Sequence, residues 1–181
     1  MSDLVTQLLE LAEFDGLDPG QVEVVDPAEI CVDVAAMMAP AAHAEKKEIA
    51  FVGPDRAVTV RTCSKSLARA LRNLVKNALA ATPAGTTVEI RLLADGRIQV
   101  MDEGPGVPPD KRDVIFRRFW RGLHGNRPGA GLGLSIVKRF VDTYGGVIEV
   151  DDARGGGAVF TLSLPQVQET HGSQAGEPAH Q

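Results

Sequence analysis

The sequence predicts an α+β fold, a two-layer sandwich in which a mixed, mostly antiparallel sheet carries helices on one face. Two observations lead to this prediction. Apolar patterns indicate strands, a helix, strands, a helix and strands in that order, without a regular βαβ alternation. Two pairs of predicted strands are separated by short segments, 94–96 and 152–157, that contain glycine and favour antiparallel hairpins.

Length and composition limit the possible classes of protein. The chain has 181 residues, 44% of them hydrophobic, enough for one domain with a normal core. Its net charge of −5 argues against a nucleic-acid or membrane-surface binder. Cys31 and Cys63 lie far apart, so neither a disulfide framework nor a cysteine zinc site is expected. No apolar run approaches the roughly 18 residues of a membrane span, so we expect a cytoplasmic domain without direct membrane contact.

The N-terminal elements are predicted from spacing and capping residues. Apolar residues at helical spacing in 1–14 indicate the end of a longer helix or a docking segment. The alternation in 21–25 is typical of a strand. Asp26 as N-cap and Pro27 at the first helical position then predict a helix that runs to the low forties, where Pro40 bends or shortens it.

The middle of the chain reads as a strand pair, a helix and a hairpin. Segments 48–52 and 57–62 are predicted to pair with each other around a Gly-Pro turn. Ser64 is the expected cap of a helix that ends near Ala81. Strands 87–93 and 97–102 follow as a hairpin.

The C-terminal part begins with a long loop, 103–128, interrupted by a short helix near 111–118. A second strong helix, 132–144, ends at a pair of glycines. Strands 147–151 and 158–164 close the fold as a second hairpin.

Two asparagines stand one turn apart on the helix that ends near Ala81. Asn73 and Asn77 lie at the boundary between its apolar and charged faces. Amides there can coordinate a hard cation and hydrogen-bond phosphate oxygens without adding negative charge. The alternative is that both are ordinary boundary residues of an amphipathic helix.

The segment DEGPGV follows a predicted strand. Gly104 and Gly106 permit close backbone approach, and Asp102 could accept a hydrogen bond from an exocyclic amine such as that of adenine. A plain turn is the alternative, because D-x-G-x-G often occurs by chance.

The segment PGAGLGLSIV places Gly129, Gly131 and Gly133 before and at the start of a helix. Free main-chain N–H groups and the helix dipole make such a start an anion cradle. It fits neither a dinucleotide fingerprint nor a Walker P-loop. A flexible hinge is the alternative.

The segment VIFRRFWRG interleaves aromatic residues with arginines. Phe116, Phe119 and Trp120 could pin a mobile loop to the core while one of the arginines reaches a phosphate. A nucleic-acid patch or a small hydrophobic cluster with solvated arginines are the alternatives.

In this order the four segments resemble the N, G1, F and G2 boxes of the catalytic, ATP-binding domain of sensor histidine kinases. That family shares a superfamily, and the Bergerat-type ATP-binding fold, with gyrase B, Hsp90 and MutL. The resemblance covers 21–165. Residues 1–20 look like the end of the dimerisation-hairpin helix and a linker, and 166–181 are expected to be a disordered tail.

The resemblance implies a role for each motif residue. Asn77 matches the magnesium-coordinating asparagine, Asp102 the adenine-reading aspartate and Arg121 an arginine near the γ-phosphate; Asn73, Asn77 and Arg121 are the implied catalytic residues. The lid over the nucleotide would be 108–128. The implied ATP-binding residues are Asn73, Asn77, Asp102, Gly104, Gly106, Val107, Phe116, Arg121, Gly129, Ala130, Gly131, Leu132, Gly133 and Leu134.

The implied activity is transfer of the ATP γ-phosphoryl group, with Mg²⁺, to a histidine on a dimerisation domain outside this chain. The implied partners are that phosphoacceptor domain and the receiver domain of a response regulator, in a full-length homodimer. The chain's four histidines lack the acidic residue and downstream proline of the family's phosphoacceptor motif: His43, His124, His171 and His180.

The sequence also departs from the family pattern. Ala80 and Ala81 stand where the family usually has a basic residue and an aromatic, and Ala130 and Ala158 replace common threonines. These changes leave open a non-enzymatic module that binds nucleotide weakly and docks partners. An anti-sigma-factor-like serine kinase with the same fold is a third hypothesis, which the N-terminal segment and the full F box argue against.

Overall fold

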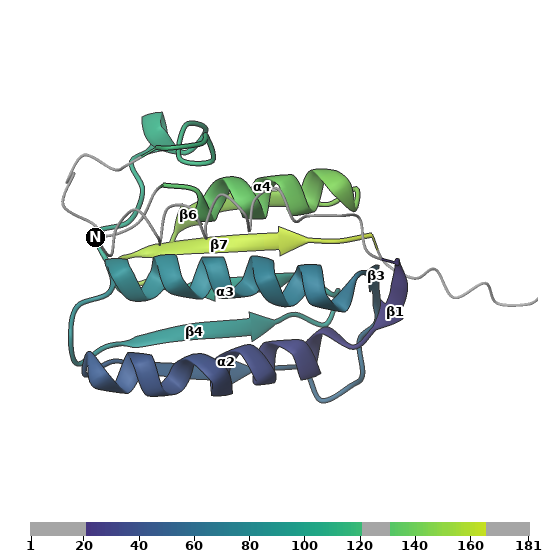
Figure 1. Cartoon of the computed structure of the whole chain (residues 1–181). Coiled ribbons are helices and arrows are strands. Elements are labelled where there is room, and N and C mark those ends of the chain that lie inside the picture. The colour runs from purple at the N-terminus through teal and green to yellow at the C-terminus, as the bar shows by residue number, and fades with distance from the viewer. Residues whose placement is uncertain (1–20, 121–130, 166–181) are drawn as a thin grey trace, which may run out of the picture.

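The computed structural model describes residues 21–120 and 131–165, which form a five-stranded sheet and three helices that cover one of its faces (Figure 1). The predicted two-layer α+β fold is thus confirmed. The segments 1–20 and 166–181 lie outside the described residues. The elements in chain order are β1 (Glu23–Val25), α2 (Pro27–Ala44), β2 (Glu48–Val52), β3 (Val60–Thr62), α3 (Ser64–Ala81), β4 (Thr87–Leu92), β5 (Ile98–Met101), the 3₁₀ turn η1 (Pro109–Lys111), α4 (Gly133–Thr143), β6 (Val147–Asp152) and β7 (Ala158–Ser163).

The five-stranded sheet has the order β2-β4-β5-β7-β6 and is antiparallel except between β2 and β4. Both predicted hairpins are present, β4 with β5 and β6 with β7. The pairing of β5 with β7 joins the hairpins, and its last pair is Met101 with Val159. The residues just beyond that pair, Asp102 and Ala158, therefore lie side by side at one end of the sheet.

The predicted pairing of 48–52 with 57–62 is wrong. β2 runs parallel to β4, whereas β3 pairs with β1 in a separate two-stranded sheet. A parallel pair needs a crossover connection, and the chain between β2 and β4 contains one, namely α3. β4 buries every second residue and pairs with β2 over five positions, a longer match than the three-residue β3 could offer.

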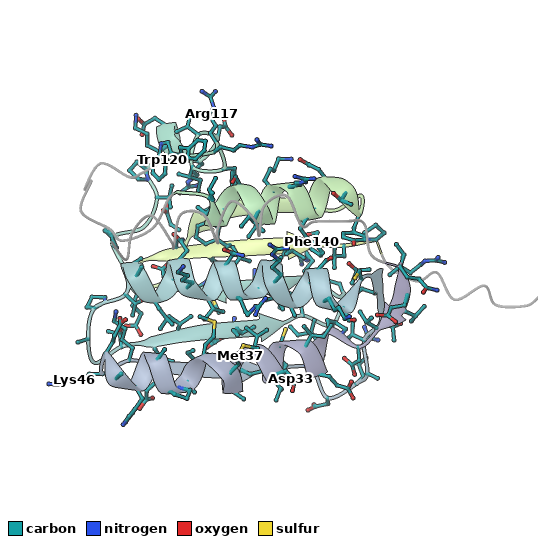
Figure 2. The ribbon with its side chains drawn as sticks, in the orientation of Figure 1. Asp33, Met37, Lys46, Arg117, Trp120 and Phe140 are labelled. Atoms are coloured by element: carbon teal, nitrogen blue, oxygen red, sulfur yellow. The ribbon has the colours of Figure 1, made fainter. Side chains whose placement is uncertain are left out.

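The helices bury apolar stripes against the sheet. On α3 the stripe includes Leu67, Leu71 and Leu74, each 0% exposed. Burial of one such leucine contributes about 1.5–3 kcal/mol. From α4, Phe140 lies between its helix and the sheet (Figure 2) and is also fully buried. Packing of α3 between α2 and α4 places the helical face that carries Asn73 and Asn77 next to the start of α4.

The helix starts differ in how closely they follow the sequence prediction. Asp26 caps α2 as predicted, because its Oδ1 accepts a hydrogen bond from Ala28 N at 2.8 Å. The cap of α3 is Cys63 and not Ser64, whose Oγ instead donates to Glu23 Oε1 at 2.8 Å. This partner comes from β1, which only the β1–β3 pairing brings close. Pro40 lies inside α2, which continues to Ala44.

The predicted short helix at 111–118 is wrong. A 3₁₀ turn covers only Pro109–Lys111, and turns follow it. Main-chain bonds from Arg117 N to Val114 O and from Trp120 N to Arg117 O span three residues, and Phe119 has a positive φ of 59°. Such geometry closes single turns and cannot propagate as an α-helix.

The two cysteines are free and buried. Burial, with a smaller contribution from the charge of Asp26, raises the pKa of the Cys31 thiol to about 12. Burial also acts to raise the pKa of Cys63, but hydrogen bonds from Ser66 and the Lys65 main chain bring it below its ordinary value. Every helix within 21–120 and 131–165 is too short or too polar to cross a bilayer.

Candidate functional site

A cavity of about 200 Å³ lies at the end of the sheet where α3 finishes and α4 begins. Its floor comes from β7 and the loop after β5, one side from α3 and α4, and the other side from the chain that runs on to residue 120. The lining residues are Asn77, Ala81, Asp102, Pro105, Gly106, Val107, Pro108, Lys111, Ile115, Trp120, Leu134, Ala158 and Phe160.

Asp102 forms the polar floor of this cavity. Its side chain is buried, with a relative exposure of 4%, and its Oδ1 accepts hydrogen bonds from Gly104 N at 2.8 Å and Ala158 N at 3.3 Å. Its own main-chain N donates to Ala158 O at 3.0 Å. A carboxylate fixed in this way is a preorganised acceptor for a donor such as an exocyclic amine.

Glycines around Asp102 let main-chain segments approach very closely. A Cβ at Gly157 would lie 1.8 Å from Asp102 O, and one at Gly104 would lie 2.7 Å from Ala81 O. Gly106 has a φ of +74° and faces Gly157 O. Gly104 and Gly106 thus have the backbone role predicted for them. Gly157 was missed, although the three-glycine run 155–157 offered a signal.

Asn77 lines the cavity, and Asn73 lies one turn earlier on α3. Asn73 Nδ2 donates to Arg69 O at 2.9 Å. A Cβ added at Gly133 would lie 3.2 Å from Asn73 Oδ1, so the first residue of α4 packs against this amide. The fold therefore brings the paired asparagines together with the glycine-rich helix start, although about 55 residues separate them in sequence.

The start of α4 can receive an anion. Its N-cap, Leu132, makes no side-chain capping bond, so this residue leaves the first-turn N–H groups open to another acceptor. Gly131 has a φ of +73°, and a Cβ there would lie 2.7 Å from Trp120 O. Leu134 lines the cavity, whereas the side chain of Leu132 is buried. Arg121, Gly129 and Ala130 lie outside the described residues.

The predicted lid is described from residue 108 to 120, and one aromatic residue anchors it. The ring of Phe116 meets Phe160 edge-on at 6.5 Å between centroids, which confirms that an aromatic residue holds this segment on the core. Phe116 does not line the cavity in this structure, whereas Val107 does. Arg117 points away from the molecule at its edge (Figure 2).

Arg112 is a second anchor, which sequence reasoning missed. Its Nε donates to Val107 O at 3.2 Å, and its guanidinium lies 3.2 Å from Asp151 Oδ1 and 2.8 Å from Asp152 Oδ1. These bonds attach the segment to the end of β6. Lys111 and Trp120, which also line the cavity, were not predicted as cavity residues because no local pattern sets them there.

The cavity residues could hold a magnesium ion only together with a bound phosphate ligand. Among the described residues no group of three or more His, Cys, Asp or Glu side chains could hold a metal ion. The amide of Asn77 offers one neutral oxygen donor. Mg²⁺ commonly takes one or two protein oxygens and completes its shell with substrate phosphates and water. The residues present suit that arrangement.

Comparisons with known proteins agree with this geometry. A family model described as histidine kinase-, DNA gyrase B- and HSP90-like ATPase matches residues 62–168. The histidine-protein kinase AfsQ2 of Streptomyces coelicolor is 34% identical over 98% of this chain and 33% of its own length. The sensor-like histidine kinase SenX3 of Mycobacterium tuberculosis is 33% identical over 94% of this chain and 43% of its own length. The chain thus spans between a third and less than half of the length of these curated relatives.

Solved structures show the same fold. The mycobacterial sensor histidine kinase MprB matches with a TM-score of 0.70 and 31% identity, over 81% of this chain and 98% of that one. Full-length ShkA in complex with AMPPNP matches with a TM-score of 0.71 and 33% identity, over 90% of this chain and 35% of that one.

Proposed function

This chain belongs to the family of histidine kinase-, DNA gyrase B- and HSP90-like ATPases, and from that premise we propose that it is the ATP-binding catalytic domain of a two-component sensor histidine kinase. It transfers the γ-phosphoryl group of ATP to a histidine on a dimerisation domain outside this chain. The phosphoryl group then passes to the receiver domain of a response regulator. The whole protein works as a homodimer, and this domain works in the cytoplasm, where ATP is available.

One observation carries the proposal: Asp102 and Asn77 face the same cavity from different elements. The carboxylate of Asp102 receives the exocyclic amine of adenine, while the apolar side chains of Val107, Ile115 and Leu134 enclose the ring. Asn77 faces the phosphates. A cavity that offers a fixed acceptor and, from another element, an amide matches a purine with a polyphosphate tail.

The phosphates lie between α3 and the start of α4 in this proposal. Asn77 Oδ1 would hold Mg²⁺, which would neutralise phosphate charge and orient the γ end. First-turn N–H groups of α4, and the glycines 129, 131 and 133, hold phosphate oxygens through the main chain. Arg121 would add a cation at the γ-phosphate. Phosphoryl transfer asks a protein mainly for this positioning and charge neutralisation.

Asn73 favours transfer over hydrolysis. In hydrolytic members of the superfamily, a glutamate stands at the position that corresponds to Asn73, and this glutamate activates water. An amide is a poor base, and Asn73 Nδ2 is already engaged with Arg69 O. We expect the isolated chain to bind Mg-ATP with little hydrolysis. Steady hydrolysis that Asn73→Ala abolishes would contradict this assignment.

The deciding experiment is calorimetric titration of the full chain with Mg-ADP, followed by phosphorylation in trans. We expect millimolar or tighter binding and no self-labelling with radiolabelled ATP. Acid-labile labelling of a separately produced phosphoacceptor domain, for example that of the relative AfsQ2, supports histidine as acceptor. Absence of nucleotide binding would favour the docking-module hypothesis, and acid-stable labelling of a partner would favour a serine kinase.

A further inference from the structure

The side of the cavity formed by α3 and α4 has no charged or aromatic lining residue among the described residues. At the end of α3 only the methyl group of Ala81 reaches the cavity, and Ala80 is exposed to solvent. Among the described lining residues, Lys111 is the single cation, and Trp120 and Phe160 are the two aromatics. Lys111 and Trp120 come from the segment after β5, on the other side of the cavity. We propose that Trp120 stacks on the purine base and that Lys111 binds a nucleotide phosphate, an inference that rests on the proposed function.

Trp120 is the aromatic that has room for a base. Phe160 is only 1% exposed, and its ring already packs against Phe116 in a T-shaped pair. Trp120 is partly exposed and lines the cavity, and its main-chain O lies close to Gly131, just before the start of α4. An aromatic face is a sequence-tolerant partner for any base. The Trp120 ring supplies the stacking surface that the methyl group of Ala81 does not.

Lys111 is the cation best placed for a phosphate. Its Nζ lies 3.2 Å from Asp110 Oδ2, and the Asp110 side chain is 69% exposed. An exposed pair of adjacent residues contributes little. A phosphate group carries more charge and lies in a less hydrated site, so it can take over the ammonium group from Asp110. The η1 turn fixes the main chain of Lys111 at the cavity edge through Lys111 N to Pro108 O at 2.9 Å.

Trp120 also provides its own reporter, because it is the single tryptophan of the chain. Mg-ADP added to the full chain should change the tryptophan emission and saturate at the dissociation constant measured by calorimetry. Trp120→Ala should weaken binding of Mg-ADP and of adenosine alike, by about tenfold or more. Trp120→Phe should recover most of the affinity. Phe119→Ala, a change in the exposed neighbouring ring, is the matched control and should bind as the unaltered chain does.

Lys111→Gln separates phosphate contact from general packing. It should weaken Mg-ADP about five- to tenfold and leave adenosine unchanged, because adenosine has no phosphate. Lys138→Gln, which removes a lysine paired with Asp142 on the outside of α4, is the control.

The outcomes separate this inference from the proposed function. If the unaltered chain gives no calorimetric binding of Mg-ADP, the proposed function fails. If Mg-ADP binds but tryptophan emission does not change, and both variants bind normally, the inference alone is overturned. Equal loss of adenosine and Mg-ADP binding in Lys111→Gln would overturn the phosphate role. If circular dichroism shows that Trp120→Ala is unfolded, the stacking role is tested instead by the change in tryptophan emission of the unaltered chain and by the Mg-ADP affinity of Trp120→Phe.

Discussion

The floor of the cavity, called the inner wall, and its solvent-facing side, called the outer wall, are built in opposite ways. The inner wall, defined as Asp102, Gly104, Gly157 and Ala158, is fixed by hydrogen bonds of main-chain N–H groups to the Asp102 carboxylate and to Ala158 O, and by contacts too close for any added carbon atom. The outer wall, residues 107–120, has two side-chain anchors, Arg112 and Phe116, and exposes several charged groups. The part of the cavity that contains Asp102 is therefore set by the sheet itself, whereas the part that faces solvent can move at a lower cost in free energy.

The largest expected effect comes from Gly157→Ala in the inner wall. Its Cβ would overlap Asp102 O, so the β6–β7 turn and the loop after β5 must separate, which costs about 3–5 kcal/mol of unfolding free energy. Thermal unfolding and Mg-ADP titration measure the two consequences. Gly155→Ala is the matched control, because Gly155 has a similar positive φ of 99° but open space around it. Equal losses for both variants would mean that backbone strain, and not the contact, matters.

Asp102→Asn should have the second-largest effect, which we expect in the affinity for Mg-ADP rather than in the free energy of unfolding. The new amide oxygen can keep the bonds from Gly104 N and Ala158 N, so we expect a loss of stability of about 1 kcal/mol or less. The amide nitrogen cannot accept from an exocyclic amine, and Mg-ADP affinity should fall about 30-fold or more. Glu103→Gln, on the neighbouring exposed carboxylate, serves as control. Unchanged affinity in Asp102→Asn would remove the inner wall from base recognition.

Phe116→Ala tests the first anchor of the outer wall. Loss of the edge-on contact with Phe160 and of part of the buried ring area should cost about 1–2 kcal/mol of stability. Faster hydrogen exchange in 107–120, with normal exchange in β5 and β7, would show that the two walls unfold separately. A uniform increase across the sheet would instead mean that both walls form one cooperative unit.

Arg112→Gln should give the smallest effect. Its partners Asp151 and Asp152 are exposed, and such ion pairs contribute about 0–1 kcal/mol. The bond to Val107 O also places the outer wall, so we expect two- to threefold weaker Mg-ADP binding, and the difference from the unaltered chain should shrink at high salt, which screens the ion pairs. Arg91→Gln, which breaks a similar pair with Glu89 on the open face of the sheet, should leave affinity unchanged. A loss of binding as large as that of Asp102→Asn would make Arg112 part of the site itself.

Local patterns were sufficient for much of the fold. Turn residues predicted both hairpins, the Asp26-Pro27 pair predicted the start of α2, and the apolar stripe predicted α3 to within a residue. The pairing of β2 and β3 failed because nearness in sequence does not decide strand order when a helix can act as crossover. The helix expected near 111–118 failed because this segment closes in single turns, which bury Ile115 and pack Phe116 on the core.

The sequence predicted those cavity residues that belong to a recognisable local motif. Asn77, Asp102, Gly106 and Leu134 line the cavity as the order of motifs indicated. Gly157, Lys111 and Trp120 were missed, since their role depends on a neighbour that is distant in sequence.

The sequence by itself determined the elements and their chemistry, because helix spacing, capping and turn preferences act over a few residues. It also placed an amide pair, a carboxylate and a glycine-rich helix start in an order that resembles a known family. Only the tertiary structure decided that α3 crosses over so that β2 joins β4, and that Gly157 touches Asp102. It alone turned Lys111 and Trp120 toward the same cavity. Such contacts arise from the packing of the whole sheet and its helices, which no short segment encodes.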